Sequence, residues 1–247
     1  MNEDQEPSVD AKPMCLPATP WGPWSGLSGG IAVAAASLLA VVIGVFAQGF
    51  IAGETGRGAG WAPMLLLQIT MAGGAVWLAG WFGGRRRQVL AFNGPIPSAN
   101  AFVVMLLVLL AFTVPYTFAI YMVRPDVLVA DNRQFVGLMR SGEWPVYALI
   151  IGVGAPLSEE LLFRGFMLPA LAKGRIGFTG AALVTTVLWT ALHFSYSVFG
   201  LIEIFMIGLI LSWALWRTGS LWAPLALHAI NNGALAFAMK FQLLPWT

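Results

Sequence analysis

Residues 154–166 read GAPLSEELLFRGF, and this stretch places three ionisable side chains inside a long apolar run. Glu159 lies near the middle of the run 145–172, roughly 21 Å from either end at about 1.5 Å per helical residue. An ionisable side chain at the centre of a bilayer costs at least about 2.5–3.5 kcal/mol. Glu159, Glu160 and Arg164 therefore need partners or a wet cavity.

Helical geometry predicts one of those partners. Glu160 and Arg164 are four residues apart, so they share a helical face and can form an ion pair. Glu159 points about 100° away from Glu160. A structural salt bridge alone therefore accounts for Glu160 and Arg164 and leaves Glu159 free to face a different group.

The composition indicates a protein that is surrounded by lipid. Of its 247 residues, 58% are hydrophobic and 10% are charged, whereas a soluble domain has about 25% charged residues. Seven apolar stretches have about 20 residues or more, enough to cross a bilayer as helices: 27–52, 61–83, 100–123, 145–172, 177–197, 198–217 and 219–240. The sequence predicts an all-α integral membrane protein with about seven transmembrane helices (six to eight).

These stretches predict four regions. Residues 1–26 form a polar N-terminal tail without a packed core. Residues 27–123 form three transmembrane helices, and residues 124–144 form an amphipathic loop at the membrane interface. Residues 145–240 form a four-helix core that contains the ionisable residues.

The charges in the loops predict the orientation of the chain. The compact basic clusters fall on the same side of the membrane as the N-terminus, which predicts that the N-terminus is inside. Arg85, Arg86 and Arg87 directly follow an apolar run, so we interpret them as flanking the membrane rather than binding nucleic acid. The expected partner is membrane lipid, with no nucleic acid. The single cysteine, Cys15, excludes an intrachain disulfide and a cysteine metal site.

The chain has two histidines, and both lie in apolar stretches of its C-terminal half. His228 and Asn232 are four residues apart on one helical face, although Asn231 is an alternative to Asn232. Trp189 is four residues before His193 and can pack against it. Two intramembrane histidines in the same half as an unpaired carboxylate favour an active site.

A carboxylate with two imidazoles has two catalytic uses. The glutamate can activate a water molecule while histidine and asparagine stabilise an oxyanion. Alternatively, Glu159, His193 and His228 can hold a divalent metal such as zinc. The HExxH signature of common zinc proteases is absent. Gln68 is expected to lie away from this cluster, and Glu203 is expected to reach the interface.

Three motifs follow one another on separate predicted spans: EExxxR from Glu159 to Arg164, WxxxH from Trp189 to His193, and HxxxN from His228 to Asn232. This order resembles the CPBP family, the CAAX-protease and bacteriocin-processing (Abi) family of intramembrane proteases. The resemblance covers roughly residues 145–240. One departure is Trp189, because the second motif more usually opens with phenylalanine.

The resemblance implies an intramembrane endopeptidase, with a peptide or membrane-protein substrate, in a bacterial cytoplasmic membrane. It assigns six site residues: Glu159 activates water, Glu160 is its neighbour, Arg164 fixes the carboxylates, His193 is the second-motif histidine, and His228 with Asn232 is the third-motif pair. The family is labelled metalloendopeptidase, yet members have also been interpreted as metal-independent glutamate proteases. Two rival functions are a proton-coupled transporter, which would use the same residues as a relay, and a non-catalytic immunity or scaffold protein.

Overall fold

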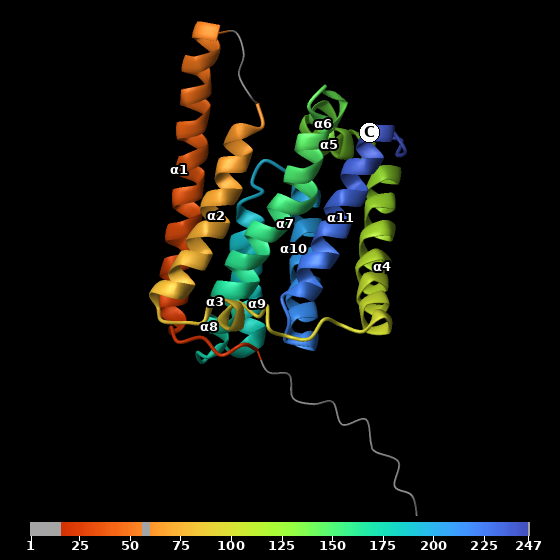
Figure 1. Ribbon diagram of the computed structural model, residues 1–247. Coiled ribbons are helices and arrows are strands. Elements are labelled where there is room, and N and C mark those ends of the chain that lie inside the picture. Colours follow the sequence, from red (N-terminus) through yellow and green to blue (C-terminus); the bar gives the residue numbers. More distant parts are fainter. Residues whose placement is uncertain (1–15, 56–59, 247) are drawn as a thin grey trace, which may run out of the picture.

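The computed structural model describes residues 16–55 and 60–246, and these residues form helices joined by turns, with no strand among them. The prediction of an all-α fold is therefore confirmed. Figure 1 shows the arrangement. Eight of the helices are α1 (Pro23–Thr55), α2 (Ala62–Trp81), α3 (Arg86–Val89), α4 (Ala99–Val123), α5 (Pro125–Arg140), α9 (Gly177–Ala191), α10 (Val198–Thr218) and α11 (Trp222–Phe241).

The remaining elements follow one another without a break from Trp144 to Ala172. They are α6 (Trp144–Leu149), the π-helix η1 (Ile150–Gly154), α7 (Ala155–Glu159), the π-helix η2 (Glu160–Met167) and α8 (Leu168–Ala172). π-Helical turns are rare and occur frequently at functional sites. This segment is called the central segment below.

Within the described residues, five segments are long and apolar enough to cross a membrane: Pro23–Phe50, Ala62–Trp81, Ala99–Val123, Trp144–Ala172 and Val198–Thr218. The stretch expected at 177–197 is shorter than predicted, because α9 has only 15 residues and ends at Ala191. Large apolar side chains on α1 and α4 point outward, including Phe46 and Phe118, which are 76% and 59% exposed. Lipid is the solvent that such surfaces require, so the protein is an integral membrane protein.

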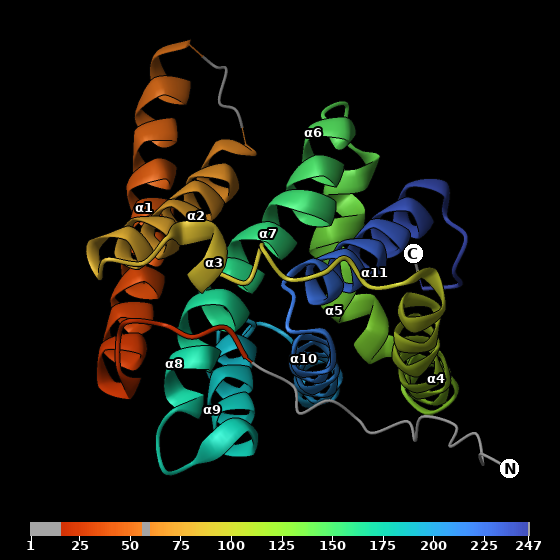
Figure 2. The same cartoon turned by 60° about the horizontal axis from the view of Figure 1, so that its bottom comes forward.

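The helices pack around the central segment (Figures 1 and 2). On one side α1 lies along α2, and α2 contacts α7 and η2. On the other side α11 contacts η1 and α10, and α4 packs on α10. In Figure 1, α3 and α8 lie at one end of the bundle, and α5 and α6 lie at the opposite end. The expected loop 124–144 thus contains the helix α5.

Local sequence signals explain where several helices begin and end. Proline occupies the first turn of α2, α5, α6 and α11, where its missing N–H costs nothing. Ser197 is the N-cap of α10, and its hydroxyl accepts a hydrogen bond from the N–H of Gly200. Gly219 ends α10 with a φ of 62°, the left-handed conformation that glycine adopts without strain.

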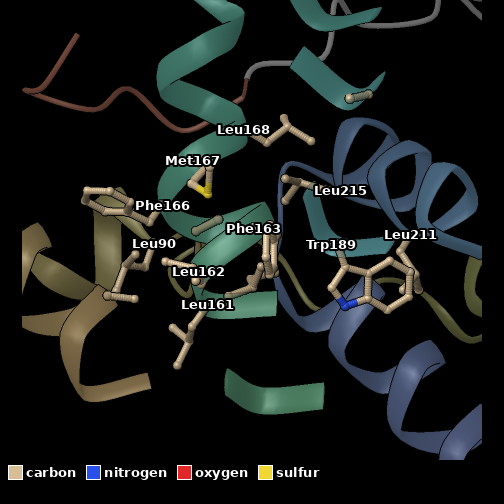
Figure 3. Close-up of a cluster of buried hydrophobic side chains, with 14 of the residues drawn as sticks. Leu90, Leu161, Leu162, Phe163, Phe166, Met167, Leu168, Trp189, Leu211 and Leu215 are labelled. Atoms are coloured by element: carbon tan, nitrogen blue, oxygen red, sulfur yellow. The ribbon is translucent and has the colours of Figure 1, made fainter. Parts of the chain in front are cut away.

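The apolar core lies where the central segment meets its neighbours. Phe163, Phe166 and Leu168 are almost fully buried, and Trp189 of α9 joins the same cluster (Figure 3). Trp21 corrects the expectation of an unpacked tail: its ring stacks on Phe166 at 4.7 Å, and it is only 2% exposed. The chain before α1 is therefore anchored at Trp21, while residues 1–15 lie outside the described part.

Candidate active site

The two adjacent glutamates of the central segment differ in their surroundings. Glu159 ends α7 and Glu160 begins η2. The side chain of Glu160 is 0% exposed, whereas that of Glu159 is 13% exposed and lines a cavity. Their different directions, expected from helical geometry, therefore separate a buried carboxylate from an accessible one.

Glu160 is the hub of a buried polar network. Its Oε1 accepts a hydrogen bond from Nη1 of Arg164 at 2.9 Å. The same oxygen lies 2.9 Å from Nδ1 of His228. Arg164 also donates through Nη2 to the carbonyl oxygen of Gly208 on α10, at 3.1 Å. The network ties η2 to α10 and α11, and it compensates the charges of a fully buried ion pair.

The bond to Glu160 sets the orientation of His228. A carboxylate that is paired with Arg164 accepts hydrogen bonds, so Nδ1 of His228 carries the donated proton. The opposite ring atom, Nε2, then faces Glu159, and the distance from Nε2 to Oε2 is 3.9 Å. A water molecule beside these two atoms could bond to both of them.

Trp189 is the partner that sequence reasoning did not find for Glu159. Its indole Nε1–H donates to Oε2 of Glu159 at 2.5 Å. The guanidinium carbon of Arg164 lies 4.6 Å from the centre of the indole ring, a cation–π distance. His193 and His228 meet the same ring edge-on, at centroid distances of 5.3 and 5.4 Å. One indole therefore contacts four of the six expected site residues.

His193 occupies a different position from the one expected. It lies in the turn between α9 and α10, two residues after the last residue of α9. Its Nδ1 is 3.0 Å from the carbonyl oxygen of Trp189, and a carbonyl can only accept, so Nδ1 donates. Nε2 of a neutral ring is then free to accept a hydrogen bond.

Asn232 fastens α11 to the π-helix η1. Its Nδ2 donates to the carbonyl oxygen of Ile151 at 3.3 Å. In a π-helix this carbonyl would bond to the N–H five residues later, but that residue is Pro156, which has no N–H. Gln68 of α2 donates to the neighbouring carbonyl of Ile150 at 3.0 Å. The expectation that Gln68 lies away from the cluster was therefore wrong.

A cavity of about 680 Å³ brings most of the expected residues together. Its wall includes Glu159, Trp189, His193, His228, Asn231 and Asn232. Glu160 and Arg164 lie behind this wall and are fully buried. Further polar wall residues come from elements that carry no motif: Gln68, Tyr116, Thr117, Asp131 and Glu203.

Glu203 is the second polar residue, after Gln68, whose expected position was wrong. It was expected to reach the membrane interface, yet its Oε1 accepts a hydrogen bond from the hydroxyl of Thr117 on α4 at 2.8 Å. Together with Asp131 and Glu159 it gives the cavity three acidic side chains. In the described part of the chain, no lysine or arginine lines the cavity.

The donor atoms do not match a three-ligand metal site. Each histidine uses Nδ1 to bond a protein oxygen, so only the Nε2 atoms of His193 and His228 are available as ligands. Zinc requires its ligands at about 2.0–2.2 Å around one centre. Within residues 16–55 and 60–246, no group of three histidine, cysteine, aspartate or glutamate residues is arranged to hold a metal ion. As they are arranged, Glu159, His193 and His228 therefore do not form the expected metal site.

Comparison with known proteins finds one similar family and two similar proteins. The model of the type II CAAX prenyl endopeptidase Rce1-like family matches residues 141–234, which is less than half of the chain. An uncharacterized 24.3 kDa protein of Escherichia coli is 43% identical over 83 residues, 32% of this chain and 38% of that protein. The UPF0177 protein YxdF of Lactococcus lactis subsp. lactis is 27% identical over 112 residues, 42% of this chain and 60% of that protein. The chain therefore matches less than two thirds of the length of either relative.

No solved structure matches the chain. The family match contains all six expected site residues, from Glu159 to Asn232, and confirms the resemblance that the three motifs indicated. The part of the chain that carries these motifs, residues 141–234, is similar to the Rce1-like family of type II CAAX prenyl endopeptidases.

Proposed function

We propose that this protein is an intramembrane endopeptidase that hydrolyses a peptide bond of a membrane-associated or peptide substrate with water activated by Glu159. The observation that carries the proposal is the position of Glu159. It is the one carboxylate of the EExxxR motif that lines the cavity, and Nε2 of His228 faces it at 3.9 Å. A base and a second polar group directed at one site are what hydrolysis of an amide requires.

The proposed reaction begins with a water molecule between Glu159 and His228. The carboxylate of Glu159 takes a proton from this water as the water oxygen bonds to the carbonyl carbon of the substrate. The carbonyl oxygen becomes negative and is stabilised by donors from the cavity wall: the second N–H of the Asn232 amide, and Nε2 of His228 or His193 when that ring carries a proton on both nitrogens. The carbon–nitrogen bond then breaks, and the proton passes from Glu159 to the leaving amine.

Glu160 and Arg164 have an indirect role in this proposal. They do not line the cavity, so they cannot touch the substrate there. Glu160 holds His228 in the orientation that directs Nε2 at Glu159, and Arg164 holds Glu160 in place by pairing with it. The residues 145–240 would then form the catalytic part of the protein, with the N-terminal helices as its support.

The cavity wall favours a bond inside a polypeptide as the target. A substrate cut beside its C-terminus brings a free carboxylate into the site. The described wall contains three acidic side chains and no lysine or arginine to balance such a charge. We therefore propose an internal segment of a peptide or membrane protein as substrate, rather than the C-terminal motif in the family's name. The bacterial relatives support a bacterial cytoplasmic membrane as the location, with the N-terminus inside.

The test is proteolysis by the purified full-length protein in detergent, with a library of quenched fluorescent peptides. Glu159→Gln keeps the size of the side chain and removes the base, so cleavage should be lost. Glu143→Gln removes an exposed carboxylate just before α6 and should leave cleavage unchanged. Cleavage that persists in Glu159→Gln would show that another group activates the water. A wild-type protein that cuts no peptide would favour a transporter or a scaffold.

A further inference from the structure

His193 differs from the other five expected site residues because it lies in a turn rather than on a helix. The turn spans residues 192–197 and joins α9 to α10. Turns are held less firmly than the elements they connect. The position of the His193 ring at the cavity therefore depends on what fixes both ends of this turn. One end is fixed by the bond from Nδ1 of His193 to the carbonyl of Trp189.

The other end of the turn is fixed by Asp131 of α5. The backbone N–H of Ser197 donates to Oδ1 of Asp131 at 2.8 Å, and the hydroxyl of Ser197 donates to Oδ2 at 2.7 Å. Ser197 is also the N-cap of α10. The carboxylate thus lies at a helix N-terminus, where a negative charge is favoured.

Gly200 allows Asp131 to come this close. A Cβ atom added to Gly200 would lie 2.6 Å from Oδ2 of Asp131, too close for any larger residue at this position. In the described residues, Asp131 has no lysine or arginine within 4.0 Å. Its charge is therefore met by Ser197 and the start of α10 rather than by a cation.

A second contact from α5 reaches His193 through an aromatic ring. Phe135, four residues after Asp131 and therefore on the same face of α5, lies 6.2 Å from Tyr196 between ring centres. Tyr196 in turn meets the ring of His193 edge-on at 6.0 Å. Asp131, Phe135, Tyr196 and His193 all line the cavity. One face of α5 therefore contacts the turn at two places.

We propose that Asp131 is a positioning residue, which holds the turn 192–197 so that His193 faces the substrate at the cavity. Asp131 acts through Ser197 and Tyr196 and takes no part in the bond-making steps. It lies before residue 141, so the support of His193 comes from outside the part that matches the family model. The role in catalysis rests on the proposed function, but the effect on the position of His193 does not.

The first test measures that position directly, without any activity. The chain has only two histidines, and both line the cavity, so the ring nitrogens of ¹⁵N-histidine-labelled protein give signals from two side chains alone. His193→Gln identifies which signals belong to His193. Asp131→Ala removes both acceptors and should shift or broaden the signals of His193. Ser197→Ala keeps the backbone bond and loses the hydroxyl bond, so its effect should be in the same direction and smaller.

The second test measures cleavage of the peptide that the wild-type protein cuts fastest. Asp131→Ala should lower kcat by about 10- to 100-fold, because displacement of a site residue by about 1 Å has effects of this size. KM should change by less than about twofold. In a His193→Ala background, Asp131→Ala should cause no further loss of kcat, since the residue through which Asp131 acts is already gone.

The control is Asp126→Asn, which changes an exposed carboxylate of the same helix that pairs with Arg124. It should alter neither the His193 signals nor kcat. Signals of His193 that are the same in Asp131→Ala and in the wild type would overturn the proposal, whether or not the protein cleaves peptides. The proposal would also be overturned if Asp131→Ala raised KM and left kcat unchanged, because that would indicate direct contact of Asp131 with the substrate. If no peptide is cut but the His193 signals move, the proposed function fails and the positioning of His193 stands.

Discussion

The indole Nε1–H of Trp189 donates a hydrogen bond to Oε2 of Glu159 and joins two residues that lie 30 positions apart. The bond restrains the carboxylate that we propose as the base. Among the described residues no donor bonds to Oε1 of Glu159, so the carboxylate is held through one oxygen only. Phenylalanine keeps an aromatic ring at this position, but it is smaller than tryptophan and has no N–H to donate.

Trp189→Phe therefore separates the hydrogen bond from the packing. Loss of a hydrogen bond to a charged group costs about 1.5–3 kcal/mol, so kcat should fall by about 10- to 100-fold. The melting temperature in detergent should fall modestly, because the smaller phenyl ring leaves part of the space of the indole unfilled. Trp216→Phe is the control, since Trp216 stacks on Phe178 away from the cavity. Equal kcat values for Trp189→Phe and the wild type would mean that this bond does not orient the base.

The ion pair between Arg164 and Glu160 predicts a stability difference within the motif. Both side chains are 0% exposed. Removing one partner of a buried pair leaves the other charge unpaired and costs about 3–5 kcal/mol. Arg164→Ala should thus lower the melting temperature in detergent clearly more than Glu159→Ala, whose side chain borders the cavity and forms no such pair.

Arg217→Ala is the matched control for Arg164→Ala. Arg217 is an exposed arginine in the last turn of α10, so its removal should have little effect on the melting temperature. The same melting temperature for Arg164→Ala and Glu159→Ala would contradict the assignment of the buried ion pair as the stabilising contact.

The fold was predictable from hydropathy because a long apolar run in lipid must form a helix to satisfy its backbone hydrogen bonds. The start of the central segment was expected at residue 145 and lies at Trp144, and the span expected at 100–123 corresponds to α4. The two π-helical parts were not predictable, because they depend on polar groups from other helices. Gln68 and Asn232 donate to the carbonyls of η1, and neither contact follows from the sequence around residues 150–154.

The candidate site was predictable where its residues are neighbours on one helix. Glu160 and Arg164 are four residues apart, and that spacing predicted their ion pair. The contacts of Asp131 and Glu203 were not predictable, because they join helices whose packing the sequence does not specify. Gln68 and Glu203 are polar residues within apolar runs, and that feature alone could have indicated that they lie at the site. Gln68 was expected away from the cluster because it lies in the first three spans, and Glu203 was expected at the interface because it lies near the end of its span.

The arrangement of donor atoms predicts that cleavage does not depend on a metal. The carboxylate of Glu159 is held by Trp189, and the described residues contain no group of three histidine, cysteine, aspartate or glutamate side chains arranged to hold a metal ion. Incubation with a chelator followed by its removal should leave kcat within about twofold of the untreated protein. Metal content of the purified protein, measured by mass spectrometry, is the accompanying control. Activity that is lost with the chelator and restored by zinc would contradict this prediction and require His193 and His228 to rearrange.

His228 and Asn232 should act as one unit on the cavity-facing side of α11. His228 is fixed through Nδ1 by Glu160, and Asn232 is fixed through Nδ2 by the carbonyl of Ile151. Removal of a single oxyanion donor typically lowers the rate about 100- to 1000-fold. His228→Ala and Asn232→Ala should each lower kcat by this order, and residues that act together give non-additive losses. The double variant should therefore be little slower than His228→Ala alone.

Asn231 provides the matched comparison for Asn232, because it is the same amide one position earlier on α11. Asn231 also lines the cavity, but among the described residues its side chain forms one long hydrogen bond, 3.4 Å from Nδ2 to Oδ1 of Asn232. It holds no part of the central segment, so Asn231→Ala should lower kcat much less than Asn232→Ala does. The melting temperature of each variant, measured in the same detergent, shows whether a loss of rate reflects the fold. If Asn231→Ala abolished cleavage and Asn232→Ala did not, the amide that serves the reaction would be Asn231, and the HxxxN motif would not describe this site.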